Sequence, residues 1–568
     1  MYKGIGACAG IGIGRAVLVR QADLDYSHVT FAGAETEKAR LAQAAAAFTE
    51  KTTAMAEQMK QRVGEHQAEI LMGQVMMLSD PFMTGQMNDA IDQGQCAEGA
   101  VDTVCGMYMD MFASVEDEMM RQRATDVKDL KERLLKILLG QEDVDLSALP
   151  ADAVLVARDL TPSMTAGLRR GSIAGIVTEV GGATSHSAIL ARAMELPAVL
   201  SVPGIVDAVQ DGDCVVVDGG EGLVLVKPED GVLLAYQARR DALLRERADL
   251  THYHNQPTRT EDGRQVQLFG NIGSVADAAA VAETSGEGVG LFRTEFLFMD
   301  RAALPDEEEQ FAAYQAVARQ FPDREVIIRT LDVGGDKDIP YLGLEREDNP
   351  FLGFRAVRYC LKREELFATQ LRAILRASAF GKLKIMLPLV TCLDELHSAR
   401  TLLEQVKADL DRAGIPYDKA IPLGVMIETP AAVLIADLLA READFFSIGT
   451  NDLTQYIMAA DRGNANVAYL NTPFQPAVLR AIRQIICAGH QAGIPVGMCG
   501  EAAADPLLIP LLLDFGLDEF SVGASAILPT RKHIAQWSAQ RARQLTEEVM
   551  ALPTASQVQT YLKTHAQP

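Results

Sequence analysis

The sequence lacks the cysteine pairs and long apolar runs that mark disulfide-rich and membrane-spanning proteins. None of its eight cysteines forms a Cys-x-x-Cys pair, so neither a zinc site nor a disulfide framework is indicated. No run reaches the roughly 18 apolar residues that a membrane helix needs. The Gly-rich start is typical of a mature N-terminus rather than a signal peptide. We therefore expect a protein of the reducing cytoplasm with no insertion into the membrane.

Basic residues are also scarce. The 568 residues include 53 Lys and Arg against 77 Asp and Glu, a net charge of −24. This balance argues against a nucleic-acid-binding protein, which usually carries a basic surface. Hydrophobic residues make up 48% of the chain, enough to exclude a disordered protein. The length predicts about three to four domains.

Proline is nearly absent from the first quarter of the chain, where Pro81 is the only one before Pro150. Residues 34–140 are rich in Ala, Glu, Gln, Met, Leu and Lys at helical spacing, which predicts a helical bundle or hairpin. Twelve of the 21 methionines lie between Met55 and Met120. They either fill the core of the bundle or line an adaptable docking surface for another protein.

The pattern changes after Pro150 to short apolar strands separated by glycines, which predicts a small α/β unit ending near Pro228. Residues 231–250 are charged and helical. From about residue 266, eight strand-like runs alternate with helical patterns: VQLFGNIG, GVGLFRTEF, EVIIRTLD, KIMLPLV, PLGVMIETP, DFFSIGTND, PVGMCGE and EFSVGAS. This alternation favours a (β/α)₈ barrel, with a doubly wound open sheet as the alternative.

Polar residues follow the predicted barrel strands, where barrel enzymes carry their chemistry. The set comprises Asn271, Arg293, Glu295, Arg329, Asp332, Lys337, Glu428, Asn451, Asp452, Cys499 and Glu501, with Arg355 and Arg462 from helical or loop positions. Four arginines indicate a ligand with several anionic oxygens. Glu428 and Asp452 follow adjacent strands and suit Mg²⁺, although ion pairing with the arginines is the alternative.

A second candidate site is the segment GGATSHSAILAR, in which a strand runs into a Gly-Gly turn and then a helix. His186 falls at the start of that helix. The N–H groups there favour an anion and disfavour imidazolium, so the imidazole tends to stay neutral and nucleophilic. A phosphoryl group on His186 would lie where backbone donors point, whereas the alternative is a capping or core histidine.

Eight motifs of the chain can be compared with known families: GGATSHSAILAR, GVGLFRTEFLFMDR, RTLDVGGDK, NPFLGFRAVR, VMIETPAA, FFSIGTNDLTQY, DRGN and GMCGE. Together they are similar to the motifs of Enzyme I of the phosphoenolpyruvate-dependent sugar phosphotransferase system. The resemblance covers essentially the whole chain. It implies transfer of the phosphoryl group of phosphoenolpyruvate to a histidine of the enzyme and then to a histidine of the carrier HPr, releasing pyruvate, as the first step of sugar uptake.

The resemblance also implies a role for each matching residue. His186 would be the phosphorylated residue, and Thr161 in the DLTPS turn would orient it. Cys499 would protonate C3 of the enolate, and Glu428 and Asp452 would hold Mg²⁺. The substrate would be bound by Arg293, Arg329, Arg355, Asn451, Asp452, Arg462 and Lys337. Many relatives have Arg where this chain has Ala183, which removes a cation near the phosphohistidine.

The implied architecture is an α/β fold of four parts. Residues 1–24 and 144–228 would form the phosphohistidine α/β domain, with residues 25–143 inserted as a helical HPr-binding subdomain. Residues 229–262 would form a linker helix, and a hinge is expected within 228–262. Residues 263–568 would form a phosphoenolpyruvate-binding TIM barrel through which the chain forms a homodimer.

Two other functions use similar motifs. A pyruvate-phosphate dikinase or phosphoenolpyruvate synthase would need an ATP-binding domain, and no G-x-x-x-x-G-K-[ST] loop occurs. A regulatory phosphorelay protein of the nitrogen-related branch would usually carry an extra N-terminal sensor domain, which we do not find.

Overall fold

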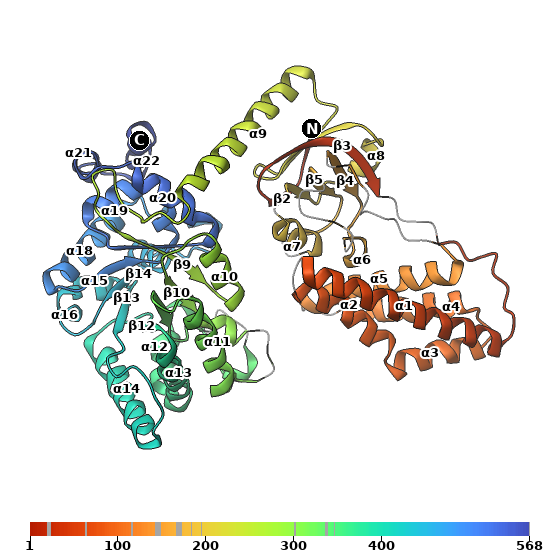
Figure 1. The fold of residues 1–568 in the computed structure, drawn as a ribbon, viewed down its shortest axis with the longest axis horizontal. Coiled ribbons are helices and arrows are strands. Elements are labelled where there is room, and N and C mark those ends of the chain that lie inside the picture. Colours follow the sequence, from red (N-terminus) through yellow and green to blue (C-terminus); the bar gives the residue numbers. More distant parts are fainter. Residues whose placement is uncertain are drawn as a thin grey trace. The chain divides into compact units, whose positions relative to one another are not determined.

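A computed structural model describes residues 1–566 except 20–23, 63–64, 115–117, 142–148, 151, 166–167, 169–172, 183–184, 195, 300, 302, 335–338 and 346. The chain divides into two compact units, Met1–Glu246 and Arg247–Pro568. Figure 1 shows the first in red to yellow and the second in green to blue. No helix in the described ranges has the length and apolar character to cross a membrane. The described residues contain no disulfide.

The first unit contains an eight-stranded sheet in the order β1-β8-β7-β3-β4-β5-β6-β2. Its strands are β1 (Tyr2–Lys3), β2 (Ile5–Cys8), β3 (Ile11–Val19), β4 (Ala153–Ala157), β5 (Gly175–Thr178), β6 (Ala198–Leu200), β7 (Cys214–Asp218) and β8 (Leu223–Val226), with short helices α6 (Pro162–Thr165), α7 (His186–Ala193) and α8 (Ile205–Ala208). The Gly-rich start of the chain has a packing reason. A Cβ at Gly14 would lie 1.8 Å from the carbonyl oxygen of Asp152, so only glycine fits there.

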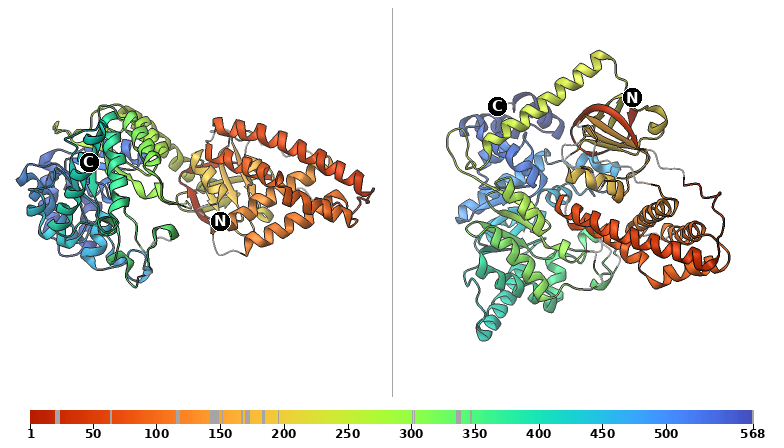
Figure 2. Two further views of the ribbon diagram at one scale, coloured as in Figure 1. Left: turned by 90° about the horizontal axis from the view of Figure 1, so that it is seen from below. Right: turned by 45° about the vertical axis from the view of Figure 1, so that its right-hand side comes forward.

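The described residues between β3 and β4 form five helices: α1 (Ala34–Arg62), α2 (Glu65–Leu78), α3 (Pro81–Asp92), α4 (Ala97–Ala113) and α5 (Glu118–Leu139). The long ones run side by side, as Figures 1 and 2 both show. The structure divides the methionines into buried and exposed ones, and a docking role for the exposed ones stays a prediction. Met83 and Met87 are buried in the bundle core, whereas Met76, Met107 and Met111 are half or more exposed.

Helix α9 (Asp230–Leu250) contains the boundary between the two units and ends in a 3₁₀ turn, η2 (Thr251–Tyr253). Most of its side chains are exposed, including Leu234 and Leu244. The helical pattern at 231–250 is thus confirmed. The boundaries predicted for the linker and for the other domains stay predictions.

The second unit is a closed barrel of eight parallel strands, which excludes the open doubly wound sheet. The strands are β9 (Gln267–Ile272), β10 (Val289–Arg293), β11 (Glu325–Arg329), β12 (Lys382–Leu387), β13 (Leu423–Ile427), β14 (Phe446–Ile448), β15 (Val496–Met498) and β16 (Glu519–Val522). Strand β16 pairs with β9 and closes the ring. Each of the eight predicted runs overlaps one of these strands, although β12 begins two residues before its run, so the (β/α)₈ prediction is confirmed.

Helices connect the strands and cover the barrel (Figure 1). They are α10 (Val275–Glu283), α11 (Glu307–Gln320), α12 (Ala356–Lys362), α13 (Glu364–Ala377), α14 (Leu393–Ala413), α15 (Pro430–Leu434), α16 (Ala436–Leu439), α17 (Thr450–Met458), α18 (Pro476–Ala492), α19 (Ile509–Phe515) and α20 (Ile527–Ala535), followed by α21 (Ala539–Met550) and α22 (Ala555–His565). Local signals set their ends. Asp306 and Glu309 form a reciprocal capping box at the start of α11, and α14 ends at Gly414 with a positive φ of 68°.

The strands of the barrel alternate between an outer face against the helices and an inner face. On β15, Val496 and Met498 belong to the main core with the helices, so Gly497 and the following Cys499 face inward. Cys499 packs inside with Leu291, Ile327, Met386, Met426 and Phe445. This alternation brings the polar residues that follow the strands to one rim.

Candidate active site

A cavity of about 320 Å³ lies at the carboxyl ends of the barrel strands. Its polar lining comprises Arg293, Glu295, Arg329, Asp332, Arg355, Glu428, Asn451, Asp452, Arg462, Cys499 and Glu501, and its apolar lining Leu291, Phe296, Met299 and Met426. Every barrel residue predicted to bind substrate or metal therefore lines one cavity, except Lys337. Lys337 lies outside the described residues.

Two buried arginines are held by a shared carboxylate. Arg329 donates from Nη2 to Glu295 Oε1 at 2.6 Å and pairs through Nη1 with Asp332 Oδ2 at 2.9 Å. Arg355 donates from Nη2 to Asp332 Oδ1 at 2.8 Å. Asp332 thus orients both guanidinium groups, and together with Glu295 it balances their charge.

The same arginines keep buried donors without an acceptor among the described residues. These are Nε of Arg329 and both Nε and Nη1 of Arg355. A buried polar group without a partner costs about 1–3 kcal/mol, and more when it is charged. Since Arg293 and Arg462 line the same cavity, the arrangement fits a ligand with several anionic oxygens.

The ring of Phe351 lies beside two of the arginines. The guanidinium carbons of Arg355 and Arg462 are 5.8 and 5.9 Å from its centroid. The Tyr456 hydroxyl donates to the Phe351 carbonyl, which fixes this segment against α17. Cation–π contact restrains both guanidinium groups without using their N–H donors.

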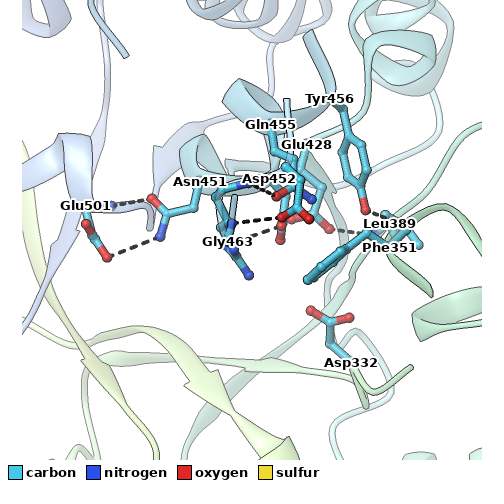
Figure 3. Close-up of polar contacts among 12 residues, drawn as sticks. Asp332, Phe351, Leu389, Glu428, Asn451, Asp452, Gln455, Tyr456, Gly463 and Glu501 are labelled. Atoms are coloured by element: carbon cyan, nitrogen blue, oxygen red, sulfur yellow. Dashed lines mark hydrogen bonds and ion pairs between the residues drawn. The ribbon is translucent and has the colours of Figure 1, made fainter. Parts of the chain in front are cut away.

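Glu428 and Asp452 follow β13 and β14, which pair in parallel, and lie beside each other in Figure 3. Glu428 is 2% exposed. Burial raises its pKa well above the usual range, and the charges of Asp452 and Asp332 raise it further. Its Oε1 accepts a hydrogen bond from the N–H of Leu389 at 2.6 Å, and Leu389 holds a positive φ of 55°. Such a strained backbone is typical of functional sites.

The carboxylate pair fits a divalent cation. Asp452 Oδ1 lies 3.4 Å from Arg462 Nη1 but accepts no hydrogen bond from the described residues. A cation at this place would lower the repulsion that raises the Glu428 pKa. Within the described ranges, no group of three or more His, Cys, Asp or Glu could hold a metal. A hard cation here would therefore need oxygens of water or substrate to complete its shell.

Cys499 lies at the floor of the cavity, just after β15, and is 4% exposed. Burial raises the pKa of its thiol to about 11, against the opposing effects of the Ser447 hydroxyl and the Arg329 charge. Its Sγ points to the carbonyl oxygen of Ile448 at 3.8 Å. The group is a protonated thiol at neutral pH, suited to donate a proton.

Two asparagines of the predicted rim have different places. Asn451 lines the cavity and exchanges hydrogen bonds of 3.4 Å with Glu501, one to its Oε1 and one from its N–H. Asn271 is absent from the described lining. Its Nδ2 donates to the carbonyls of Cys499 and Ser521, at 3.0 and 3.1 Å, so it ties strands together inside the barrel.

His186 belongs to the first unit, where it is the first residue of α7. Ser185 caps the helix by accepting a hydrogen bond from the N–H of Ala188 at 3.4 Å. The preceding turn uses Gly181 at a φ of +112°, where a side chain would be strained. The predicted position at a helix start is thus confirmed. The His186 side chain and residues 183–184, including Ala183, lie outside what the structure describes.

Thr161 is buried near the start of α6. Its Oγ1 is 3.1 Å from Ser163 Oγ, and Ser163 donates to Asp129 Oδ1 of α5 at 2.5 Å. Thr161 therefore belongs to a hydrogen-bond network with Ser163 and Asp129, which joins the α/β part of the first unit to the helical insertion. Its role in orienting His186 stays a prediction.

Sequence reasoning missed several parts of this site. The N–H of Leu389 is a backbone group, so no residue type marks it. Phe351 lies within the NPFLGFR motif, yet only the structure shows its ring between two arginines.

Comparison with known families gives three matches along the chain. The family described as "PEP-utilising enzyme, PEP-binding domain" matches residues 247–539, which contain the barrel strands. The "PEP-utilising enzyme, N-terminal" family matches residues 3–123. The "PEP-utilising enzyme, mobile domain" family matches residues 149–222, which contain His186.

Curated relatives match over nearly the whole chain. "Phosphoenolpyruvate-protein phosphotransferase" of Geobacillus stearothermophilus is 43% identical over 561 residues, covering 99% of this chain and 97% of the relative. The protein of the same name from Bacillus subtilis is 43% identical and covers 99% of both chains. That of Listeria monocytogenes is 44% identical over 98% of this chain and 97% of the relative. The chain therefore belongs to the family of phosphoenolpyruvate-protein phosphotransferases.

Proposed function

We propose that this enzyme transfers the phosphoryl group of phosphoenolpyruvate to its own His186 and then to a histidine of HPr, releasing pyruvate, as the first step of sugar uptake. One observation carries the proposal. Arg329 and Arg355, which keep buried donors without an acceptor among the described residues, line the same cavity as the carboxylate pair and the Cys499 thiol. A substrate with phosphate and carboxylate oxygens next to a carbon that must be protonated matches this arrangement.

The substrate is held by its charged oxygens. Arg293, Arg329, Arg355 and Arg462 contact the phosphate and carboxylate, helped by Asn451, Asp452 and Lys337. Glu428 and Asp452 hold Mg²⁺, which when bound neutralises negative charge on the substrate oxygens. The family match supports phosphoenolpyruvate as the ligand of this unit.

The chemical step breaks the P–O bond of phosphoenolpyruvate and forms an N–P bond at His186. The electron pair of the broken bond leaves on the enolate of pyruvate, and Cys499 gives its proton to C3. Arginines that are already oriented by Asp332 and Glu295 meet the charge without reorganising. His186 is the first residue of α7, and the N–H groups at a helix start favour the anionic phosphoryl product.

His186 lies in one unit and the cavity in the other, so transfer requires that the units meet and separate. We place the hinge within 228–262. Residues 1–24 and 144–228 then form the phosphohistidine domain, 25–143 the HPr-binding subdomain and 263–568 the barrel, through which the enzyme forms homodimers. The exposed Met76, Met107 and Met111 of the insertion support a docking role. The lack of a disulfide among the described residues supports a location in the cytoplasm.

The test is labelling by phosphoenolpyruvate. Purified enzyme with Mg²⁺ and phosphate-labelled phosphoenolpyruvate should acquire acid-labile label that passes to HPr. His186→Ala should abolish labelling, whereas His252→Ala, at an exposed histidine of η2, should leave it unchanged. Labelling of His186→Ala at the wild-type rate would show that another residue is phosphorylated.

A further inference from the structure

One side of the barrel interior is polar below Cys499. Glu519 and Ser521 of β16 alternate with Phe520 and Val522, which pack on the outer face, so both point inward. Ser447 of β14 lies between Phe446 and Ile448, which also pack outward. The opposite side of the interior is apolar, with Leu291, Ile327, Met386 and Met426. The buried Glu519 carboxyl and the Cys499 thiol thus both lie inside the barrel. The proposed function assigns no role to this carboxyl.

Strand register sets Ser447 and Glu519 on either side of one glycine. Gly497 is the Cα partner of Ser447 on β14 and of Glu519 on β16. A Cβ at Gly497 would lie 3.0 Å from Cδ of Glu519. A Cβ at Gly290 would lie 2.2 Å from its Oε1. The two glycines therefore make room for the carboxyl, and no side chain at position 497 separates it from Ser447.

Glu519 and Ser447 each have a buried atom that can form a further hydrogen bond. Glu519 Oε1 and Ser447 Oγ are buried, and neither has a hydrogen-bond partner among the described residues. The hydroxyl of Ser447 lies close enough to the Cys499 thiol to lower its pKa. Buried polar atoms usually have partners, so these two exceptions on the inner face of the barrel require an explanation.

Burial favours the protonated form of the Glu519 carboxyl. Burial raises its pKa to about 8, the negative charges of Glu325 and Asp518 raise it, and the ammonium of Lys384 opposes them. Lys384 pairs with Glu325 at 2.7 Å and both side chains reach solvent at the amino end of the barrel. Cys499 lies inside the barrel two residues beyond Gly497, the strand partner of Glu519, and the charge of Glu519 raises the pKa of its thiol. Glu519 therefore lies between a solvent-accessible ion pair and the proton donor.

We propose that Glu519 is a proton reservoir that reloads Cys499 through Ser447 after each turnover. The proposal rests on the function proposed above. When Cys499 has given its proton to C3 of the enolate, its sulfur is a thiolate enclosed in the barrel. The O–H bond of the Glu519 carboxylic acid breaks, the Ser447 hydroxyl passes a proton on, and a new S–H bond forms at Cys499. Glu519 is left as a carboxylate and regains a proton from solvent at the amino end of the barrel.

The experiment compares two isotope exchanges in the full-length enzyme with phosphoenolpyruvate, pyruvate and Mg²⁺. Carbon-labelled pyruvate reports the exchange of pyruvate with phosphoenolpyruvate. Pyruvate tritiated on its methyl group reports release of the Cys499 proton to water. Carbon exchange needs no proton to leave the thiol, because the thiolate can take a proton back from the next pyruvate. The ratio of tritium release to carbon exchange therefore reports the rate of proton transfer between Cys499 and water, separately from the rates of substrate binding and phosphoryl transfer.

Glu519→Gln, which keeps the shape and removes the acidic proton, should lower this ratio by about tenfold or more. Ser447→Ala should lower it too, and this small substitution carries the test if the Gln variant fails to fold. Glu283→Gln, the same change at an exposed position, should keep the wild-type ratio. A wild-type ratio in Glu519→Gln or in Ser447→Ala overturns the reservoir, as does a parallel loss of both exchanges. Absence of carbon exchange in the wild-type enzyme would instead overturn the proposed function, and the reservoir with it.

Discussion

Arg355 donates one hydrogen bond to Asp332, from Nη2 to Oδ1 at 2.8 Å, and keeps Nε and Nη1 without an acceptor among the described residues. Arg355 and Asp332 are each 4% exposed. The carboxylate uses one corner of the guanidinium fork and leaves the other donors for a ligand. An arginine held in this way is oriented before the substrate arrives, which lowers the entropic cost of binding.

Arg355→Lys should therefore weaken substrate binding strongly. A lysine keeps the charge but cannot bridge Asp332 and a ligand with fixed, divergent donors. We expect KM for phosphoenolpyruvate to rise by roughly 10- to 100-fold, the loss of about 1.5–3 kcal/mol for hydrogen bonds to a charged group. Steady-state kinetics measure it. Arg363→Lys, at an exposed arginine outside the described lining, should leave KM within about twofold, and an equal rise in both variants would contradict the prediction.

Removal of one carboxylate of the Glu428–Asp452 pair should lower the affinity of the enzyme for Mg²⁺. Asp452→Asn replaces an anionic oxygen by a neutral one and weakens the attraction for a hard cation. We expect Mg²⁺ to bind about tenfold or more weakly, which is at least about 1.4 kcal/mol. Calorimetric titration of the apo-enzyme with Mg²⁺ gives the constant. Glu501→Gln, which also lines the cavity, should change the affinity much less, and if both variants retain wild-type affinity the metal lies elsewhere.

Cys499→Ala should slow catalysis far more than it weakens binding. The thiol is the acid that C3 needs, and a general acid contributes about 10²- to 10⁴-fold to a rate. Because the side chain is buried and the four arginines of the cavity are unchanged, binding of the charged oxygens should persist. Pyruvate release should fall by about that factor with KM within a few fold. An equal loss in kcat and in affinity would mean that Cys499 has a packing role only.

Glu519 should make the stability of the barrel fall as the pH rises. Its pKa is raised from 4.5 to about 8 in the folded state, so the unfolded chain releases this proton first. Stability from this group is full below pH about 4.5 and is lost progressively up to pH about 8. At pH 7 the loss is about 3 kcal/mol, at 1.36 kcal/mol per unit.

Glu519→Gln removes that titration. The variant should unfold at a higher denaturant concentration than the wild type at neutral pH, and the difference should shrink toward pH about 5. Denaturant unfolding of both proteins across this range measures it. A difference that does not change with pH would show that Glu519 is not held protonated by the fold. Stabilisation together with slower proton release would mark a residue kept for function at the expense of stability.

Much of the barrel site could be predicted from the sequence, because its residues follow strands. Glu428 and Asp452 come directly after short apolar runs, and parallel strands in a barrel end at one rim. The charged types of Arg329 and Arg355 also indicate an anionic ligand. The carboxylates that pair with these two arginines could not be predicted. Several acidic residues follow barrel strands, and the sequence pattern allows any of them to be the partner.

The chemistry-bearing residue types and the alternation of strands and helices are local properties, so the sequence alone determined the fold class and the members of the site. Which donors stay free, which carboxylates repel each other and which acid lies under Cys499 depend on the register of β14, β15 and β16 and on the closure of β16 against β9. Register and closure come from the packing of side chains far apart in the sequence. Only the tertiary structure therefore shows that Glu519, a residue at the opposite end of its strand from the rim, shares the barrel axis with the thiol.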